Sequence, residues 1–173
     1  MVLPLPSRVT VQISSRGSKW GSAFLRVSGS STGESNAGLG HNKSMEAFKS
    51  SLTIGLGAAV GANARFWFGH WFTGRWTPTI PWHTLIINAF GSLVLGVFMA
   101  LALAKGWGTG WRLLVAVGFA GGFTTFSAFS AEAMTLLEEA KVGASATYVT
   151  LSVSLSIAAC FAGLHFARLA LGK

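Results

Sequence analysis

The sequence has little charge, one cysteine and no aspartate. Only 10% of its 173 residues are charged, whereas a typical soluble domain has about 25%. Cys160 is the single cysteine, which excludes an intramolecular disulfide framework and a cysteine-rich metal site. The chain also lacks an HExxH helix, a P-loop and a GxGxxG turn, so the enzyme classes that these motifs mark are excluded. We therefore do not expect an enzyme.

Hydrophobic residues are abundant, at 51% of the chain. The net charge is +8, which alone would suggest a nucleic-acid partner. Nucleic-acid-binding domains, however, gather their basic residues on one face or helix, and here the basic residues are scattered between apolar runs. The composition therefore indicates a polytopic membrane protein in contact with lipid, with no nucleic acid as partner.

Residues 1–44 differ in kind from the rest. They are rich in serine, carry five basic residues and one acidic residue, and show no sustained hydrophobic periodicity. Such a segment cannot bury enough apolar surface to offset its ordering entropy, so we predict disorder. Two interpretations remain: an organelle transit peptide, or a start codon assigned too early, because Met45 directly precedes the first apolar run. We favour the second, which makes residues 45–173 the working domain.

Residues 45–173 contain four apolar segments, at about 52–72, 82–104, 113–137 and 144–171. Each has the ~20 residues that a helix needs to cross ~30 Å of hydrocarbon. The sequence therefore predicts an all-α membrane protein with four transmembrane helices. The basic residues between the segments give only a weak bias in orientation by the positive-inside rule, so insertion in both orientations, and with it an antiparallel dimer, is plausible.

Polar residues recur every four positions in two of these segments. Such spacing puts them on one helix face; the two sets are Thr84, Asn88 and Ser92 in the second segment, and Tyr148, Ser152, Ser156 and Cys160 in the fourth. One interpretation is a hydrogen-bonding track through the membrane, because polar groups there must pair or face a cavity. The other is close helix packing through small polar residues. For Asn88, which is costlier to bury unpaired, we favour the track.

The third segment contains Gly121 and Gly122 followed by Thr124 and Thr125. Paired glycines and β-branched residues make poor helix, so we predict a break there. Freed carbonyls at such a break can coordinate a small hard cation such as sodium; the alternative is glycine-mediated packing without an ion.

Three further residues have two interpretations each. Phe126 and Phe129 share a face beyond the break, and their ring edges could contact an anion or belong to the core. Arg65, in the first segment, could draw anions into a vestibule or anchor the helix.

These residues resemble a known family, the Fluc (CrcB) fluoride channels. The resemblance rests on Gly61-Ala62-Asn63-Ala64-Arg65, on Thr84-Leu85-Ile86-Ile87-Asn88 with Gly91, and on the string from Gly121 to Glu132. It covers essentially all of residues 45–173 and none of residues 1–44. Two positions depart from the family pattern: Cys160 stands where a hydroxyl is common, and Ala128 where threonine is common.

The resemblance implies an antiparallel, dual-topology homodimer of four-helix subunits with two fluoride pores. It implies a structural sodium ion on the main-chain carbonyls of Gly121 and Thr124, and a vestibule at Arg65. The implied fluoride pathway is formed by Thr84, Asn88, Phe126, Phe129, Tyr148, Ser152 and Ser156.

The function implied is passive export of fluoride across the cell inner membrane, which lowers cytoplasmic fluoride. Two alternatives stay open. A small proton-coupled multidrug exporter would need a membrane-embedded carboxylate, and Glu132 lies near the end of its segment. A non-transporting membrane assembly protein is suggested only by the basic charge.

Overall fold

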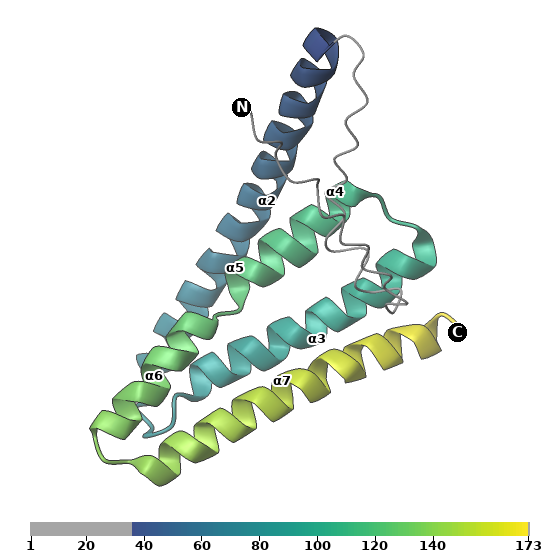
Figure 1. The fold of residues 1–173 in the computed structure, drawn as a ribbon. Coiled ribbons are helices and arrows are strands. Elements are labelled where there is room, and N and C mark those ends of the chain that lie inside the picture. The colour runs from purple at the N-terminus through teal and green to yellow at the C-terminus, as the bar shows by residue number, and fades with distance from the viewer. Residues whose placement is uncertain (1–35, 173) are drawn as a thin grey trace, which may run out of the picture. The chain divides into compact units, whose positions relative to one another are not determined.

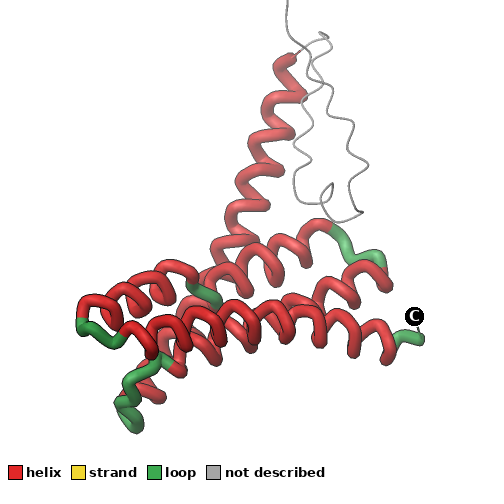
Figure 2. Tube along the Cα trace, turned by 60° about the horizontal axis from the view of Figure 1, so that its bottom comes forward, coloured by secondary structure: helices red, strands yellow, loops and turns green. Residues whose placement is uncertain are grey.

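The computed structural model describes residues 36–172, with side chains from residue 42 onward. The chain divides between Ala37 and Gly38 into two units, and the second, Gly38–Lys173, contains nearly all of the described residues. The described part is helical and contains no strand (Figures 1 and 2). The elements are α2 (Asn36–Thr73), α3 (Trp82–Lys105), α4 (Thr109–Trp111), η1 (Arg112–Ala120), α5 (Gly121–Phe123), α6 (Phe126–Glu138) and α7 (Val142–Ala170).

Helix α2 begins earlier than we predicted. Residues 36–44, which we had assigned to the disordered extension, belong to this helix. A helix extends at little cost once its first turn has formed, and residues 36–44 contain no proline that would stop it. The rest of the predicted extension, residues 1–35, lies outside the described residues.

Among the described residues, three helical stretches are long and apolar enough to cross a membrane: Trp82–Lys105, Thr109–Glu138 and Val142–Ala170. The prediction of an all-helical, multi-pass membrane protein is confirmed. The first of our four predicted spans is helical, within α2, but is not among the three. Polar residues such as Asn63, Arg65 and His70 make it less apolar than the others.

Helices α3 and α7 pack against each other along their length (Figures 1 and 2). Two glycines allow the backbones to approach. A Cβ atom on Gly96 would collide with the Cys160 carbonyl oxygen, and one on Gly163 with the Leu93 carbonyl oxygen. Small residues at helix crossings are the usual means of close packing in membranes, where the hydrophobic effect does not drive helices together.

The stretch Thr109–Glu138 corresponds to our third predicted segment and is called the third span below. Helix α2 meets it through glycines on both sides. A Cβ atom on Gly57 or Gly61 would collide with the backbone of η1, and one on Gly122 with the backbone at Ala58. Both partners therefore carry a small-xxx-small pattern, Gly57 with Gly61 and Gly118 with Gly122. The resulting contact holds α2 against the residues just before the break.

The third span changes conformation twice. Residues Arg112–Ala120 form a wide π-helical stretch, and the chain then leaves the helical conformation at Thr124 and Thr125, whose ψ angles are 155° and 115°. The predicted break is confirmed, and Figure 1 shows it as the extended link between α5 and α6. Beyond the break, a buried core of Leu85, Phe129, Leu136 and Tyr148 joins α6 to α3 and α7.

Candidate functional site

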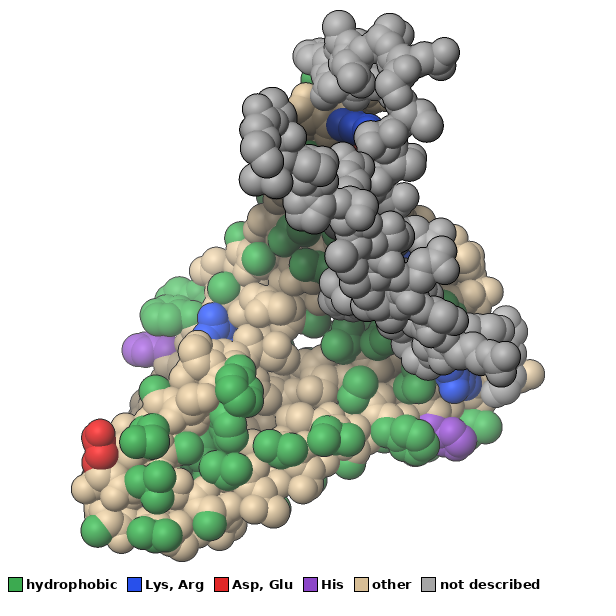
Figure 3. Space-filling view, in the orientation of Figure 1, with side chains coloured by type: hydrophobic (Ala, Val, Ile, Leu, Met, Phe, Trp, Pro, Cys, Tyr) green, Lys and Arg blue, Asp and Glu red, His purple; other side chains and the backbone are tan. Residues whose placement is uncertain are grey.

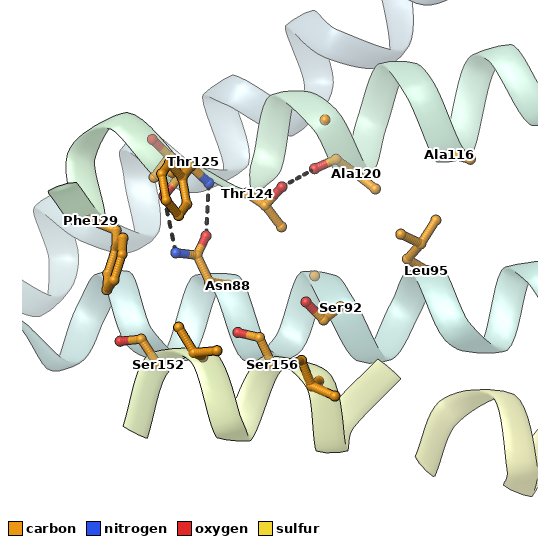
Figure 4. A pocket seen from close by; sticks show the side chains of 15 residues that line it. Asn88, Ser92, Leu95, Ala116, Ala120, Thr124, Thr125, Phe129, Ser152 and Ser156 are labelled. Atoms are coloured by element: carbon orange, nitrogen blue, oxygen red, sulfur yellow. Dashed lines mark hydrogen bonds between the residues drawn. The ribbon is translucent and has the colours of Figure 1, made fainter. Parts of the chain in front are cut away.

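A cavity of about 400 Å³ lies beside the break, between α3, the third span and α7 (Figure 4). No charged side chain is among the described residues that line it. Five of the residues predicted for the pathway line this cavity, namely Asn88, Phe126, Phe129, Ser152 and Ser156, and so do Gly121 and Thr124. The structure thus brings part of each predicted polar helix face, Asn88 with Ser92 and Ser152 with Ser156, to the break.

The side-chain amide of Asn88 is paired with the backbone at the break. Its Nδ2 donates to the Thr125 carbonyl oxygen at 3.0 Å, and the Thr125 N–H donates to Asn88 Oδ1 at 2.8 Å. The bond from the Thr125 N–H satisfies a backbone donor that the break leaves without its helical acceptor. The Asn88 amide is a second donor to the Thr125 carbonyl, which as the N-cap of α6 also accepts the first bond of that helix. An amide NH₂ has two hydrogens, so the second N–H remains available to another acceptor.

Two backbone carbonyls at the break lose their helical donors. In a continuous α-helix the Thr125 N–H would bond to Gly121 and the Ala128 N–H to Thr124. Here the Thr125 N–H bonds to Asn88, and the Ala128 N–H bonds to the Thr125 hydroxyl at 3.2 Å. The carbonyl oxygens of Gly121 and Thr124 are therefore left without the donors that a continuous helix would supply.

Phe126 and Phe129 stand in a row of rings beside the break. Their centroids are 5.3 Å apart, and Phe129 is again 5.3 Å from the ring of Tyr148. Phe129 is buried, whereas Phe126 is 77% exposed. Phe129 therefore belongs to the core and also lines the cavity. The exposure of Phe126 excludes that ring from the core of this single chain.

Serine hydroxyls face the cavity from α7. Figure 4 shows Ser152 and Ser156 on the same side of that helix, facing α3. The Ser152 oxygen is buried and forms no hydrogen bond of good geometry with a described residue. Its hydroxyl lies near that of Tyr148, which donates to Glu132. A buried hydroxyl without a partner is costly, so Ser152 can donate to a molecule that enters the cavity.

Glu132 organises a polar cluster next to the cavity. Thr84 Oγ1 donates to its Oε1 at 2.8 Å, and Tyr148 Oη donates to its Oε2 at 2.6 Å. Thr84 and Tyr148, which we predicted for the pathway, are thus bonded to this carboxylate and do not line the cavity. Sequence reasoning missed Glu132 as a site residue, although an acid within an apolar segment was a signal that could have found it.

The remaining candidates lie apart from the cavity. Arg65, on α2, is half-buried, and its buried Nε forms no hydrogen bond with a described residue. Cys160 lies further along α7, where its backbone faces Gly96. Neither residue is among those that line the cavity.

Comparison with known proteins gives one family. Residues 52–164 match the family model described as "CrcB-like protein, Camphor Resistance (CrcB)". This match contains the break, the cavity-lining residues and the Glu132 cluster.

Individual relatives are also similar. A protein of Erythrobacter litoralis (strain HTCC2594) named "Fluoride-specific ion channel FluC" is 45% identical over 126 residues, covering 69% of this chain and 92% of the relative. Proteins of the same name from Rhizobium etli (strain CFN 42) and Roseiflexus sp. (strain RS-1) are 43% and 40% identical, each over 68% of this chain and 95% of the relative.

Proposed function

Because this chain belongs to the CrcB family, we propose that it is a fluoride-specific ion channel that lets fluoride leave the cell passively. Fluoride enters cells as neutral HF and ionises inside, so the membrane potential is enough to expel the anion. The observation that carries the proposal is the cavity at the break, which combines free hydrogen-bond donors with the absence of charged lining side chains among the described residues. Weak contacts of this kind favour conduction, since a tightly bound ion does not leave.

The pathway runs past Asn88, Phe126, Phe129, Ser152 and Ser156. The second N–H of Asn88 and the hydroxyl of Ser152 supply hydrogen-bond donors, and ring edges of Phe126 and Phe129 supply the weakly positive part of the aromatic quadrupole. Thr84 and Tyr148 form one end of the pathway, where they hold Glu132. Arg65 forms a vestibule.

A structural sodium ion binds the main-chain carbonyls of Gly121 and Thr124. Support comes from the redirected N–H groups of Thr125 and Ala128, which leave these two carbonyls without helical donors. Carbonyl oxygens suit a small hard cation. When bound, the ion would supply positive charge that neutralises the carbonyl dipoles at the break and fixes its conformation.

The working unit is an antiparallel, dual-topology homodimer in which α2 supplies the fourth span. The single chain leaves Phe126 77% exposed, and a Cβ atom built on Gly121 would meet no atom within 4 Å. Hydrophobic side chains are spread over α6 and α7 on the face seen in Figure 3. A second copy over the break would cover Phe126 and bring two sets of carbonyls to one ion.

The deciding experiment for the channel is fluoride efflux from liposomes that contain the purified protein, with chloride as control. We expect fluoride efflux and little chloride efflux; equal flux of both ions, or none, would contradict the proposal.

For the dimer, photobleaching of singly labelled protein in membranes should occur in two steps, and single-step bleaching would contradict it. Labelling of an introduced cysteine from both sides of the membrane would test dual topology.

The alternatives are not favoured. An exporter of cationic drugs would use a carboxylate that exchanges protons with its substrate, but both oxygens of Glu132 already accept hydrogen bonds within the protein. Neither the family description nor the names of the relatives indicate an assembly protein. We place the channel in the cell inner membrane as a multi-pass protein.

A further inference from the structure

His83 lies beside the carboxylate that closes one end of the pathway. Its Nε2 is 3.4 Å from Glu132 Oε1, and the two side chains are equally accessible, each 24% exposed. The carboxylate itself is held in place by Thr84 and Tyr148, one on each oxygen. His83 is therefore a titratable group at a fixed position next to a fixed negative charge.

Side chains or backbone of α2 and α6 lie next to His83, and α7 bonds to the same carboxylate. Helix α6 contributes Glu132, and α7 contributes Tyr148, which donates to the other oxygen of that carboxylate. Helix α2 contributes the apolar ring of Phe72, 6.0 Å away between centroids, and the backbone at Gly69. Glu132 is thus the charged group that a protonated His83 would pair with among the described residues.

Other charged groups near this end are engaged elsewhere. His70 of α2 stacks on Phe66 at 6.1 Å, and Arg75 lies over the ring of Trp71 at 4.9 Å. In the turn between α6 and α7, Lys141 pairs with Glu139 at 2.8 Å. None of these three contacts gives Glu132 another charged partner. A proton on His83 would therefore change the net charge beside Glu132.

Glu132 is close enough to the pathway for its charge to act on a passing anion. Tyr148, which donates to Glu132, contacts the ring of Phe129, and Phe129 lines the cavity. Thr84, the other donor, lies one helical turn from Asn88. A negative charge at this position repels fluoride, and a positive charge beside it offsets the repulsion.

We infer that His83 is an acid-sensing residue at this end of the pathway, whose protonated ring offsets the charge of Glu132 and raises fluoride passage. The inference rests on the proposed fluoride channel. An imidazole ring that takes up a proton carries a positive charge and donates from both nitrogens, so the effect increases as the pH falls. His83 acts through Glu132 and is a positioning residue that need not touch the ion.

The test is the single-channel fluoride current in planar bilayers at a series of pH values. Neutral HF carries no current, so its increase in acid does not disturb the measurement. We expect the wild-type current to rise by about two- to fivefold from pH 7.5 to pH 5.5, the range that a partly exposed charge pair supports. In His83→Gln, which cannot be charged, the current should stay low and flat over the same range.

Two further variants complete the test. His83→Lys carries its charge throughout the range and should give a high, flat current, which also guards against a folding defect in the first variant. His165→Gln, at an exposed histidine stacked on Phe161 of α7, should keep the wild-type profile. A wild-type profile in His83→Gln would overturn the inference alone, whereas absence of fluoride current in every protein at every pH would overturn the channel itself.

Discussion

Asn88 and Thr125 exchange two hydrogen bonds across the break in the third span, amide to carbonyl at 3.0 Å and N–H to amide oxygen at 2.8 Å. The arrangement fixes the orientation of the Asn88 amide, because only one placement of its oxygen and nitrogen satisfies both bonds. The same side chain that stabilises the break therefore also lines the cavity, with a second N–H that is not needed for the break.

Replacing Asn88 with Asp should impair both stability and conduction. The carboxylate can still accept from the Thr125 N–H, but the Thr125 carbonyl loses its bond from the side-chain amide, at a cost of about 1 kcal/mol in the free energy of unfolding. A negative charge beside the cavity should lower fluoride flux about tenfold, equivalent to ~1.4 kcal/mol of added barrier. Thermal unfolding in detergent and liposome efflux measure the two effects.

Ser92→Ala is the matched control for this change, because Ser92 lines the same cavity from α3 without a bond to the break. We expect nearly wild-type stability for it. Wild-type flux in Asn88→Asp would mean that Asn88 serves helix packing alone.

The sequence predicts the break in the third span, but it does not predict that Asn88 bonds to the backbone there. Two glycines followed by two threonines in an apolar run are a local signal, because helix propensity is a property of neighbouring residues. The bond between Asn88 and Thr125 joins different helices, and periodicity indicates only which face a polar residue occupies. Which neighbour that face meets depends on how the helices are rotated, and this is decided by contacts such as those at Gly57 and Gly96.

The Glu132 cluster illustrates the same limit. Thr84 and Tyr148 were correctly recognised as polar residues on membrane helices, yet both side chains bond to Glu132. Three helices must come together before that cluster exists. The start of α2 was missed for another reason, since residues 36–44 have no hydrophobic periodicity and their helix continues the apolar segment that follows.

Ser152→Ala should separate conduction from stability. The buried hydroxyl of Ser152 forms no hydrogen bond of good geometry with a described residue, so its removal should leave the free energy of unfolding unchanged within about 0.5 kcal/mol. Fluoride flux should fall severalfold, because an anion in the cavity loses a donor worth about 1 kcal/mol. Efflux and thermal unfolding are measured on the same preparation.

Ser145→Ala should give the opposite pattern. Its hydroxyl donates to the Ala133 carbonyl at 2.9 Å, away from the cavity, so we expect a stability loss of about 1 kcal/mol and normal flux per folded channel. If both variants conduct normally, the Ser152 hydroxyl is not part of the pathway.

Phe126→Ile should lower fluoride flux without unfolding the subunit. The ring is 77% exposed in the single chain, so little packing within the subunit is lost, but an aliphatic side chain has no positive ring edge to offer an anion. Efflux should drop about tenfold or more, equivalent to ~1.4 kcal/mol, while size-exclusion chromatography still shows the dimer. Unchanged efflux would assign Phe126 to packing between subunits.

Sodium should stabilise the folded protein. If the ion binds the carbonyls at the break, the free energy of unfolding rises by about 2.7 kcal/mol at a sodium concentration a hundredfold above its Kd. Thermal unfolding is followed after prolonged dialysis, with N-methylglucamine chloride replacing sodium chloride at constant ionic strength. Equal unfolding temperatures in the two salts, and equal flux, would contradict a structural ion that exchanges with the bath.

Gly57→Val should force α2 away from the third span. A Cβ atom at residue 57 would collide with the Leu114 carbonyl oxygen and the backbone of Phe119, and backbone cannot move aside as a side-chain end can. Overpacking of this kind costs about 1–3 kcal/mol in the free energy of unfolding. Because Gly57 and Gly118 hold α2 against the residues just before the break, flux should fall as well.

Gly110→Ala is the control for that substitution, since a Cβ atom there would meet nothing within 4 Å. It should unfold at or slightly above the wild-type temperature, because alanine favours helix over glycine by up to about 1 kcal/mol. The comparison is made by thermal unfolding in one detergent and by efflux from liposomes of one lipid composition. Wild-type stability in Gly57→Val would show that α2 is not held at this crossing, and the proposal that α2 forms the fourth span would lose its main structural support.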